Sequence, residues 1–172
     1  MNVFFYIAAG VAIISTIMAI SGKNAIHSLL YLILSLLAVS VIFYLLSAPF
    51  IAALEVIIYA GAIMVLFIFV TMMLNIGLER ESENKWLRPR MWIIPSILAV
   101  ILLTTLIISL KNIESVSPDK DAILPKQVGI SLFSTYLLGV EIAAILLMAG
   151  VIGAYHLGSQ KKKVVHRFLK TK

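Results

Sequence analysis

The chain has no cysteine among its 172 residues. Thiolate-held iron–sulfur clusters, disulfides and cysteine-type zinc sites are therefore excluded from it. Charged residues are also scarce, at 13% against about 25% in soluble domains, whereas 62% of the residues are apolar. This composition indicates an integral membrane protein, and the apolar segments leave no room for a separate soluble domain.

In place of soluble-domain patterns, the sequence has five long apolar segments. Each is close to or longer than the roughly 20 residues that a helix needs to cross a bilayer core. The segments are apolar on every face, which favours helices over the alternating strands of a β-barrel. We therefore predict an all-α membrane protein with a bundle over residues 1–158 and a basic tail at 159–172. The expected spans cover residues 3–20, 25–46, 50–75, 91–110 and 129–157.

The distribution of basic residues predicts the orientation of the spans. Of the 14 Lys and Arg residues, 11 lie on one side of the expected spans and three, Lys111, Lys120 and Lys126, on the other. Because cytoplasmic loops retain positive charge, we expect the N-terminus outside and the C-terminus in the cytoplasm. The net charge of +6 is explained by this asymmetry, so we expect no nucleic-acid partner.

Two carboxylates are the only charges inside the expected spans, Glu55 in the third and Glu141 in the fifth. An unpaired charge at the bilayer centre costs about 2.5–3.5 kcal/mol on insertion scales. Each must therefore be neutral, hydrogen-bonded, hydrated or paired with another chain. Glu55 is either an interfacial residue or part of a proton path. Glu141, roughly 18 Å from the start of its expected span, is either a protonated packing residue or part of a proton relay.

A tyrosine and a weak point in the helix follow Glu55. Tyr59 comes one helical turn later and shares a face with Glu55. It is either a core tyrosine with a satisfied hydroxyl or a coupling residue. The triplet Ala60–Ala62 comes next. Gly61 at its centre lowers helix stability by about 1 kcal/mol relative to Ala and permits a close backbone approach.

Small residues four apart in the fifth span predict close helix packing. These are Gly139 with Ala143, Ala149 with Gly153 and Gly150 with Ala154. The sequence contains no metal-ligand spacing, no nucleophile with a base and no phosphate-binding loop. We therefore expect no catalytic centre on this chain.

Two segments resemble subunit J of bacterial NADH-quinone oxidoreductase, the proton-pumping respiratory complex I. They are HSLLYLILSLLAVS at 27–40 and LEVIIYAGAIMVLFIFVTMMLN at 54–75, and LLGVEIAAILLMAGVIGAYHLG at 137–158 adds to the likeness. The resemblance implies a membrane-arm subunit in the bacterial cytoplasmic (inner) membrane. It implies NADH, FMN, iron–sulfur clusters and quinone on other subunits and no cofactor here. The implied partners are the other membrane-arm subunits, including a small three-span subunit with buried glutamates.

In that family the third span can contain a π-bulge near its tyrosine, and its change to a regular α-helix is thought to make or break a water path. Carried over to this sequence, the bulge falls at Tyr59, Ala60 and Gly61, with Val65 among the residues that rotate. Glu55, Tyr59 and Glu141 become supporting candidates for the proton path, because the principal proton-carrying glutamates of the family belong to neighbouring subunits.

The leading hypothesis is a non-redox subunit that couples quinone reduction to proton pumping through a switchable third span. Two alternatives stay open. One is a purely structural subunit whose small-residue faces serve assembly. The other is the related subunit of a cation/proton antiporter or of a membrane-bound hydrogenase.

Overall fold

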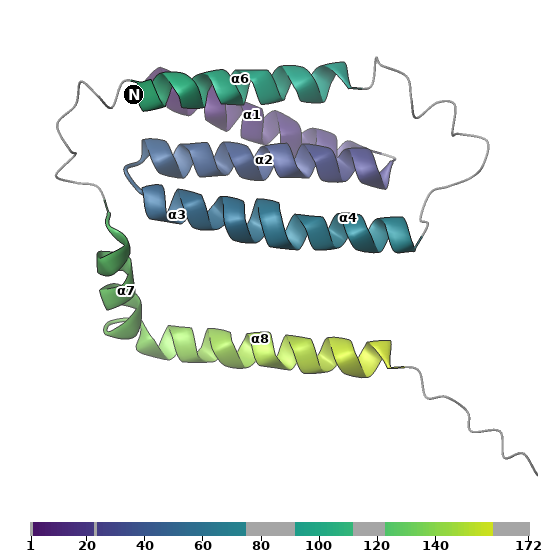
Figure 1. The fold of residues 1–172 in the computed structure, drawn as a ribbon, viewed down its shortest axis with the longest axis vertical. Coiled ribbons are helices and arrows are strands. Elements are labelled where there is room, and N and C mark those ends of the chain that lie inside the picture. Colours follow the sequence, from purple (N-terminus) through teal and green to yellow (C-terminus); the bar gives the residue numbers. More distant parts are fainter. Residues whose placement is uncertain (1, 23, 75–91, 112–122, 160–172) are drawn as a thin grey trace, which may run out of the picture. The chain divides into compact units, whose positions relative to one another are not determined.

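The computed structural model describes residues 2–22, 24–74, 92–111 and 123–159 (Figure 1). Within these ranges every regular element is a helix. The elements are α1 (Asn2–Ser21), α2 (Ala25–Leu45), α3 (Pro49–Leu54), the π-helix η1 (Glu55–Ile63), α4 (Met64–Met73), α6 (Ile93–Lys111), α7 (Pro125–Phe133) and α8 (Leu137–Gly158). α3, η1 and α4 follow one another without a break and together form one span.

Five helical stretches in the described part of the chain are long and apolar enough to cross a membrane. They are Val3–Ser21, Ala25–Leu45, Pro49–Met73, Ile93–Lys111 and Leu137–Gly158. The prediction of an all-α membrane protein with five spans is thereby confirmed, whereas its orientation stays a prediction. Apart from Ser159, the basic tail expected at 159–172 lies outside the described residues, as do the expected span ends at 75 and 91.

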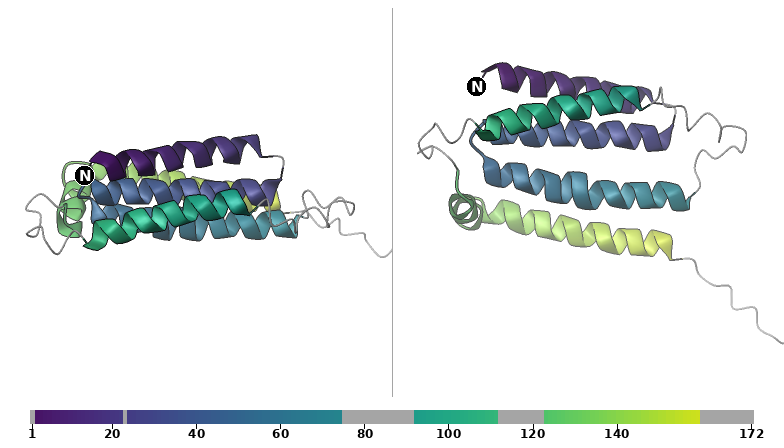
Figure 2. Two further views of the ribbon diagram at one scale, coloured as in Figure 1. Left: turned by 90° about the horizontal axis from the view of Figure 1, so that it is seen from above. Right: turned by 45° about the horizontal axis from the view of Figure 1, so that its top comes forward.

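The chain divides into two compact units, Met1–Pro125 and Lys126–Lys172, and the single bundle expected over residues 1–158 stays a prediction. In the first unit α2 is the central helix, because it contacts α1, α3, η1, α4 and α6 (Figure 2). α6 also contacts α1, so α1, α2 and α6 pack as a trio. The third span lies against α2 along its whole length, through α3, η1 and α4.

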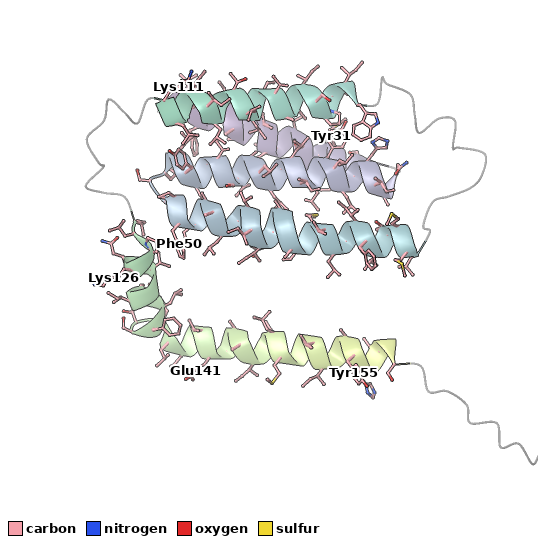
Figure 3. The ribbon with its side chains drawn as sticks, in the orientation of Figure 1. Tyr31, Phe50, Lys111, Lys126, Glu141 and Tyr155 are labelled. Atoms are coloured by element: carbon pink, nitrogen blue, oxygen red, sulfur yellow. The ribbon has the colours of Figure 1, made fainter. Side chains whose placement is uncertain are left out.

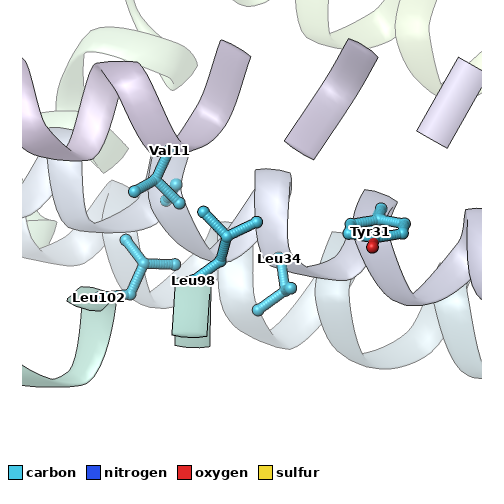
Figure 4. Close-up of a cluster of buried hydrophobic side chains, with 6 residues drawn as sticks. Val11, Tyr31, Leu34, Leu98 and Leu102 are labelled. Carbon is cyan, nitrogen blue, oxygen red and sulfur yellow. The ribbon is translucent and has the colours of Figure 1, made fainter. Parts of the chain in front are cut away.

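The core of the first unit lies where α1, α2 and α6 meet (Figure 4). Its buried side chains are Val11, Tyr31, Leu34, Ala38, Leu98 and Leu102. The small side chain of Ala38, which is fully buried, permits close approach of a neighbouring helix. These three helices therefore form the well-packed part of the unit.

Hydroxyl groups join α1 to α2 within this packed region. Thr16 Oγ1 and Ser35 Oγ are 2.7 Å apart, and Ser35 Oγ also donates to the carbonyl of Ala12 over 3.2 Å. Interhelical hydrogen bonds of this kind contribute about 0.6 kcal/mol each in membranes. The α1–α2 pair is thus held by polar contacts as well as by packing.

A tight turn connects α2 to α3. Ser47 at its centre has φ of 60°, and the N–H of Ala48 donates to the carbonyl of Phe43 over 3.0 Å. Pro49 follows as the first residue of α3. An N–H at this position would have no partner within the helix, so the lack of one in proline costs no hydrogen bond. The start of the third span is therefore fixed close to the end of α2.

The second unit holds a short helix, α7, and the fifth span, α8. α7 runs across the direction of α8, and residues 134–136 form the turn between them (Figure 1). In this turn the N–H of Tyr136 donates to the carbonyl of Ser131 over 3.1 Å. The expected fifth span at 129–157 is therefore divided, because its first residues belong to α7.

This division changes the position of Glu141. In the undivided span it was expected near the middle, whereas in the structure it lies in the second turn of α8 (Figure 3). At 1.5 Å per residue, Glu141 is about 6 Å along the axis from Leu137. The carboxylate thus belongs to one end of the span.

Candidate functional site

The third span contains a π-helix of nine residues, Glu55–Ile63. At its end the N–H of Met64 donates to the carbonyl of Tyr59, five residues earlier, where an α-helix would use the residue four earlier. At its start the N–H of Glu55 still donates to the carbonyl of Ile51, four residues earlier. The hydrogen-bond register therefore changes inside this segment. π-Helices are rare and occur often at functional sites, which makes η1 the candidate site.

The register change alters which way the later residues face. An α-helix turns by about 100° per residue, so each residue inserted by a π-turn rotates everything after it by that amount. α4 is consequently rotated about its axis relative to the α-helix that the same residues would form. Val65, predicted to be among the rotating residues, lies in α4 directly after η1.

Gly61 fits the π-helix because it has no Cβ. A Cβ at this position would lie 3.1 Å from the carbonyl oxygen of Val56, five residues earlier. That separation is shorter than an ordinary van der Waals contact, so one of the two groups would have to move. The Ala60–Ala62 triplet thus lies in η1 with a glycine at the position where the π-register crowds a side chain.

Glu55 and Tyr59 lie in the same π-helix, and Tyr59 is its central residue. Glu55 is its first residue and is half-buried, whereas 49% of the Tyr59 surface is exposed. No residue of η1 is fully buried within the first unit. One face of η1 is therefore left uncovered by the helices of the first unit.

An apolar cavity of about 410 Å³ lies beside the start of the π-helix. Its walls come from α2, α3, η1 and α6. The lining residues are Leu34, Leu37, Ser40, Val41, Tyr44, Pro49, Ala52, Ala53, Val56, Ala99, Leu102, Leu103 and Leu106. Ser40 and Tyr44 supply its polar groups.

Ser40 is a residue to which the sequence analysis assigned no role. Its Oγ donates a hydrogen bond of 2.9 Å to the backbone carbonyl of Ala52, close to the start of η1. A serine in an apolar helix is one signal of such a contact, but its partner here is a backbone atom of another helix. Sequence patterns do not identify that partner.

Glu141 and the small residues of the fifth span belong to the second unit, so the candidate site is built from the first unit alone. Gly139, Ala143, Gly150 and Gly153 all lie on α8. Within its own unit, a Cβ at any of these three glycines would meet no atom within 4 Å. Their role in helix packing stays a prediction.

The described residues thus define a multi-pass membrane protein whose third span contains a π-helix. Its relatives are consistent with this class. The family model for NADH-ubiquinone/plastoquinone oxidoreductase chain 6 matches residues 15–157. A protein of Pseudomonas aeruginosa named NADH-quinone oxidoreductase subunit J is 52% identical to this chain, over 95% of this chain and 99% of that relative. The protein of the same name in Escherichia coli K12 is 47% identical, over 94% of this chain and 89% of that relative.

A further relative of the same name, from Buchnera aphidicola, is 45% identical over 94% of this chain and all of the relative. The chain therefore belongs to the NADH-ubiquinone/plastoquinone oxidoreductase chain 6 family, and the resemblance to subunit J is confirmed. These relatives are named as subunits of an enzyme complex.

Replacing Gly61 with Ala tests what maintains the π-register. In the π-helix the new Cβ lies 3.1 Å from the carbonyl oxygen of Val56, and crowding of this kind costs about 1–3 kcal/mol. We expect the ratio of π-helix to α-helix to fall about fivefold or more. The helix can be observed directly by electron cryomicroscopy of the purified complex. Gly10→Ala in α1 is the matched control, since a Cβ there meets nothing within 4 Å. An unchanged π-helix in Gly61→Ala would contradict the argument.

Replacing Glu141 with Gln tests whether this residue carries protons. Glu141 lies near one end of α8, and Gln keeps its size together with one carbonyl acceptor and a donor in place of a protonated carboxyl. We therefore expect Gln to leave assembly intact and proton pumping within about twofold of wild type. Pumping in inverted membrane vesicles is the measurement. A large loss of pumping in a fully assembled complex would instead assign Glu141 to the proton path.

Proposed function

We propose that this chain is a non-redox membrane subunit of a proton-translocating NADH-quinone oxidoreductase in the bacterial cytoplasmic (inner) membrane. Its third span couples quinone reduction to proton pumping by changing between a π-helix and an α-helix. The observation that carries the proposal is the π-helix Glu55–Ile63 in the middle of a membrane span. The names of the relatives favour an NADH-quinone oxidoreductase over an antiporter or a hydrogenase.

Hydrogen bonding makes a π-to-α change feasible inside a bilayer. An unsatisfied backbone group in hydrocarbon costs several kcal/mol, so a span cannot simply unwind. A π-helix and an α-helix both satisfy their N–H and carbonyl groups, with partners five or four residues away. The two forms can therefore differ by a small free energy while the residues after the change rotate by about 100°.

The rotation would alter a polar path at the face of η1 that the described helices of the first unit leave uncovered. Tyr59 is half-exposed and Glu55 is half-buried there, and Val65 would turn with α4. In one form an apolar side chain such as Val65 occupies the path, and in the other water does. Glu55 and Tyr59 then orient water, and the transported proton is carried mainly by groups on neighbouring chains.

The partners follow from this arrangement. The exposed face of η1 would contact other membrane-arm subunits, including a small three-span subunit with buried glutamates. NADH, FMN, the iron–sulfur clusters and the quinone would be bound by other subunits. The purely structural alternative makes a different prediction, because changes in a space-filling subunit lower the yield of the complex and its activity together.

Purification of the intact complex tests the membership. The chain, tagged at its C-terminus and extracted in mild detergent, is expected to migrate with the flavin- and cluster-bearing subunits and with NADH-oxidising activity. Mass spectrometry of the co-migrating chains is the measurement, and an unrelated tagged five-span protein is the control. Migration of the chain alone as a monomer would overturn the proposal.

Replacing Gly61 with Val tests the coupling. The branched side chain next to the Val56 carbonyl destabilises the π-helix by about 1–3 kcal/mol, which is the usual cost of overpacking. We expect NADH-driven proton pumping to fall at least fivefold. Pumping in inverted vesicles is normalised to NADH:ferricyanide activity, which reports the amount of assembled complex. Gly10→Val is the control, and unchanged pumping in assembled Gly61→Val complex would contradict the coupling role.

A further inference from the structure

A buried serine holds the backbone of the third span just before its π-helix. Ser40 in α2 is 7% exposed, and its Oγ donates to the carbonyl oxygen of Ala52 over 2.9 Å. Ala52, in α3, is itself only 6% exposed. The bond therefore joins α2 to the main chain of the third span, so a rotation of α3 would break it.

The carbonyl that Ser40 contacts lies at the change of hydrogen-bond register. The N–H of Glu55, the first residue of η1, donates to the carbonyls of Ile51 and Ala52. A carbonyl oxygen has two lone pairs, so the Ala52 oxygen can accept from the helix and from Ser40 together. Hydroxyl groups that bond to helix carbonyls compete with the regular ladder and are a known cause of local irregularity.

The two helices that flank η1 are held unequally within the first unit. α3 is attached at its start by the turn around Ser47 and near its end by the Ser40 bond. Each helix has one buried residue, Ala52 in α3 and Met64 in α4, so the difference between them lies in these hydrogen bonds. The hydroxyl of Thr71 bonds to the carbonyls of Phe67 and Ile68 of its own helix.

We propose that Ser40 is a positioning residue that keeps α3 fixed to α2, so that a change of register in η1 turns α4 and leaves α3 in place. This inference rests on the proposed coupling function. A change from π-helix to α-helix must rotate one flanking segment relative to the other, and the segment with fewer attachments moves. Glu55, three residues after Ala52, then keeps its position while Val65 and the rest of α4 turn.

The cavity beside Ser40 permits a conservative replacement. Both Ser40 and Ala52 line this space of about 410 Å³, so the additional methyl group of Thr can be placed without displacing a helix. Ser40→Thr keeps the donor, whereas Ser40→Ala removes it at nearly the same volume. Ser40→Cys replaces the hydroxyl with a slightly larger thiol, which is only a weak donor, and serves as a second variant should Ser40→Ala assemble poorly.

Ser35→Ala is the matched control. Ser35 lies on the same helix, is 6% exposed and also donates to a backbone carbonyl, that of Ala12 in α1. Its loss removes one buried hydroxyl from α2 without touching the third span. Any effect common to both alanine variants reflects a general loss of packing.

Hydrogen–deuterium exchange in the purified complex tests the attachment itself. Loss of one hydrogen bond is expected to raise amide exchange at residues 52–57 about 2- to 10-fold in Ser40→Ala. Exchange there should stay at the wild-type rate in Ser35→Ala and Ser40→Thr. Equal exchange at residues 52–57 in Ser40→Ala, Ser40→Cys and wild type would overturn the proposal.

Combining this variant with Gly61→Val tests which segment turns. With Ser40 intact, Gly61→Val should change exchange in α4 and leave α3 as in wild type; with Ser40→Ala added, both segments should change. A change in α3 as large as that in α4 while Ser40 is intact would contradict the proposal. Unchanged proton pumping in assembled Gly61→Val complex would instead refute the coupling function, while these exchange patterns would still establish Ser40 as the attachment of α3.

Discussion

The constraint on which this structure depends is that the bilayer core supplies no hydrogen-bond partners to the backbone. Every N–H and carbonyl within a span must therefore be satisfied by the protein, and helices do so within a single segment. The third span satisfies its groups in two registers, α in α3 and α4 and π in η1. Because a π-helix, like an α-helix, bonds its backbone groups within the segment, this span can contain an irregularity that an unwound segment could not provide at acceptable cost.

The number and type of spans follow from the sequence because burial in lipid requires long uninterrupted apolar segments. The fifth span shows where this reasoning fails. The residues of α7 and α8 are both apolar enough to be read as one continuous span. The turn at 134–136 that separates them depends on backbone hydrogen bonds, such as the one from the N–H of Tyr136 to the carbonyl of Ser131. Backbone turns of this kind change hydropathy little. The same turn places Glu141 in the second turn of α8, whereas hydropathy had placed it near the middle of one long helix.

The candidate site was less accessible to sequence reasoning than the spans. Residue types in an α-helix and a π-helix hardly differ, so the expectation of a bulge came from the family resemblance. Gly61 was the one local signal, and its physical meaning, the short separation from the Val56 carbonyl, needs coordinates. Ser40 was missed because its partner is the main chain of Ala52, and any residue in that position would offer the same carbonyl.

The division of the first unit into a well-packed and a sparsely packed part suits a coupling subunit. α1, α2 and α6 share the buried core, whereas α4 contributes one buried side chain, Met64. Segments that move in function are drawn from the less stable parts of a protein. A two-state segment whose forms are nearly equal in free energy responds to a differential interaction of a few kcal/mol. Because α3 is attached to a rigid neighbour, such an interaction rotates α4 and leaves α3 in place. A small change at a partner surface can therefore determine which side chains of α4 face the polar path.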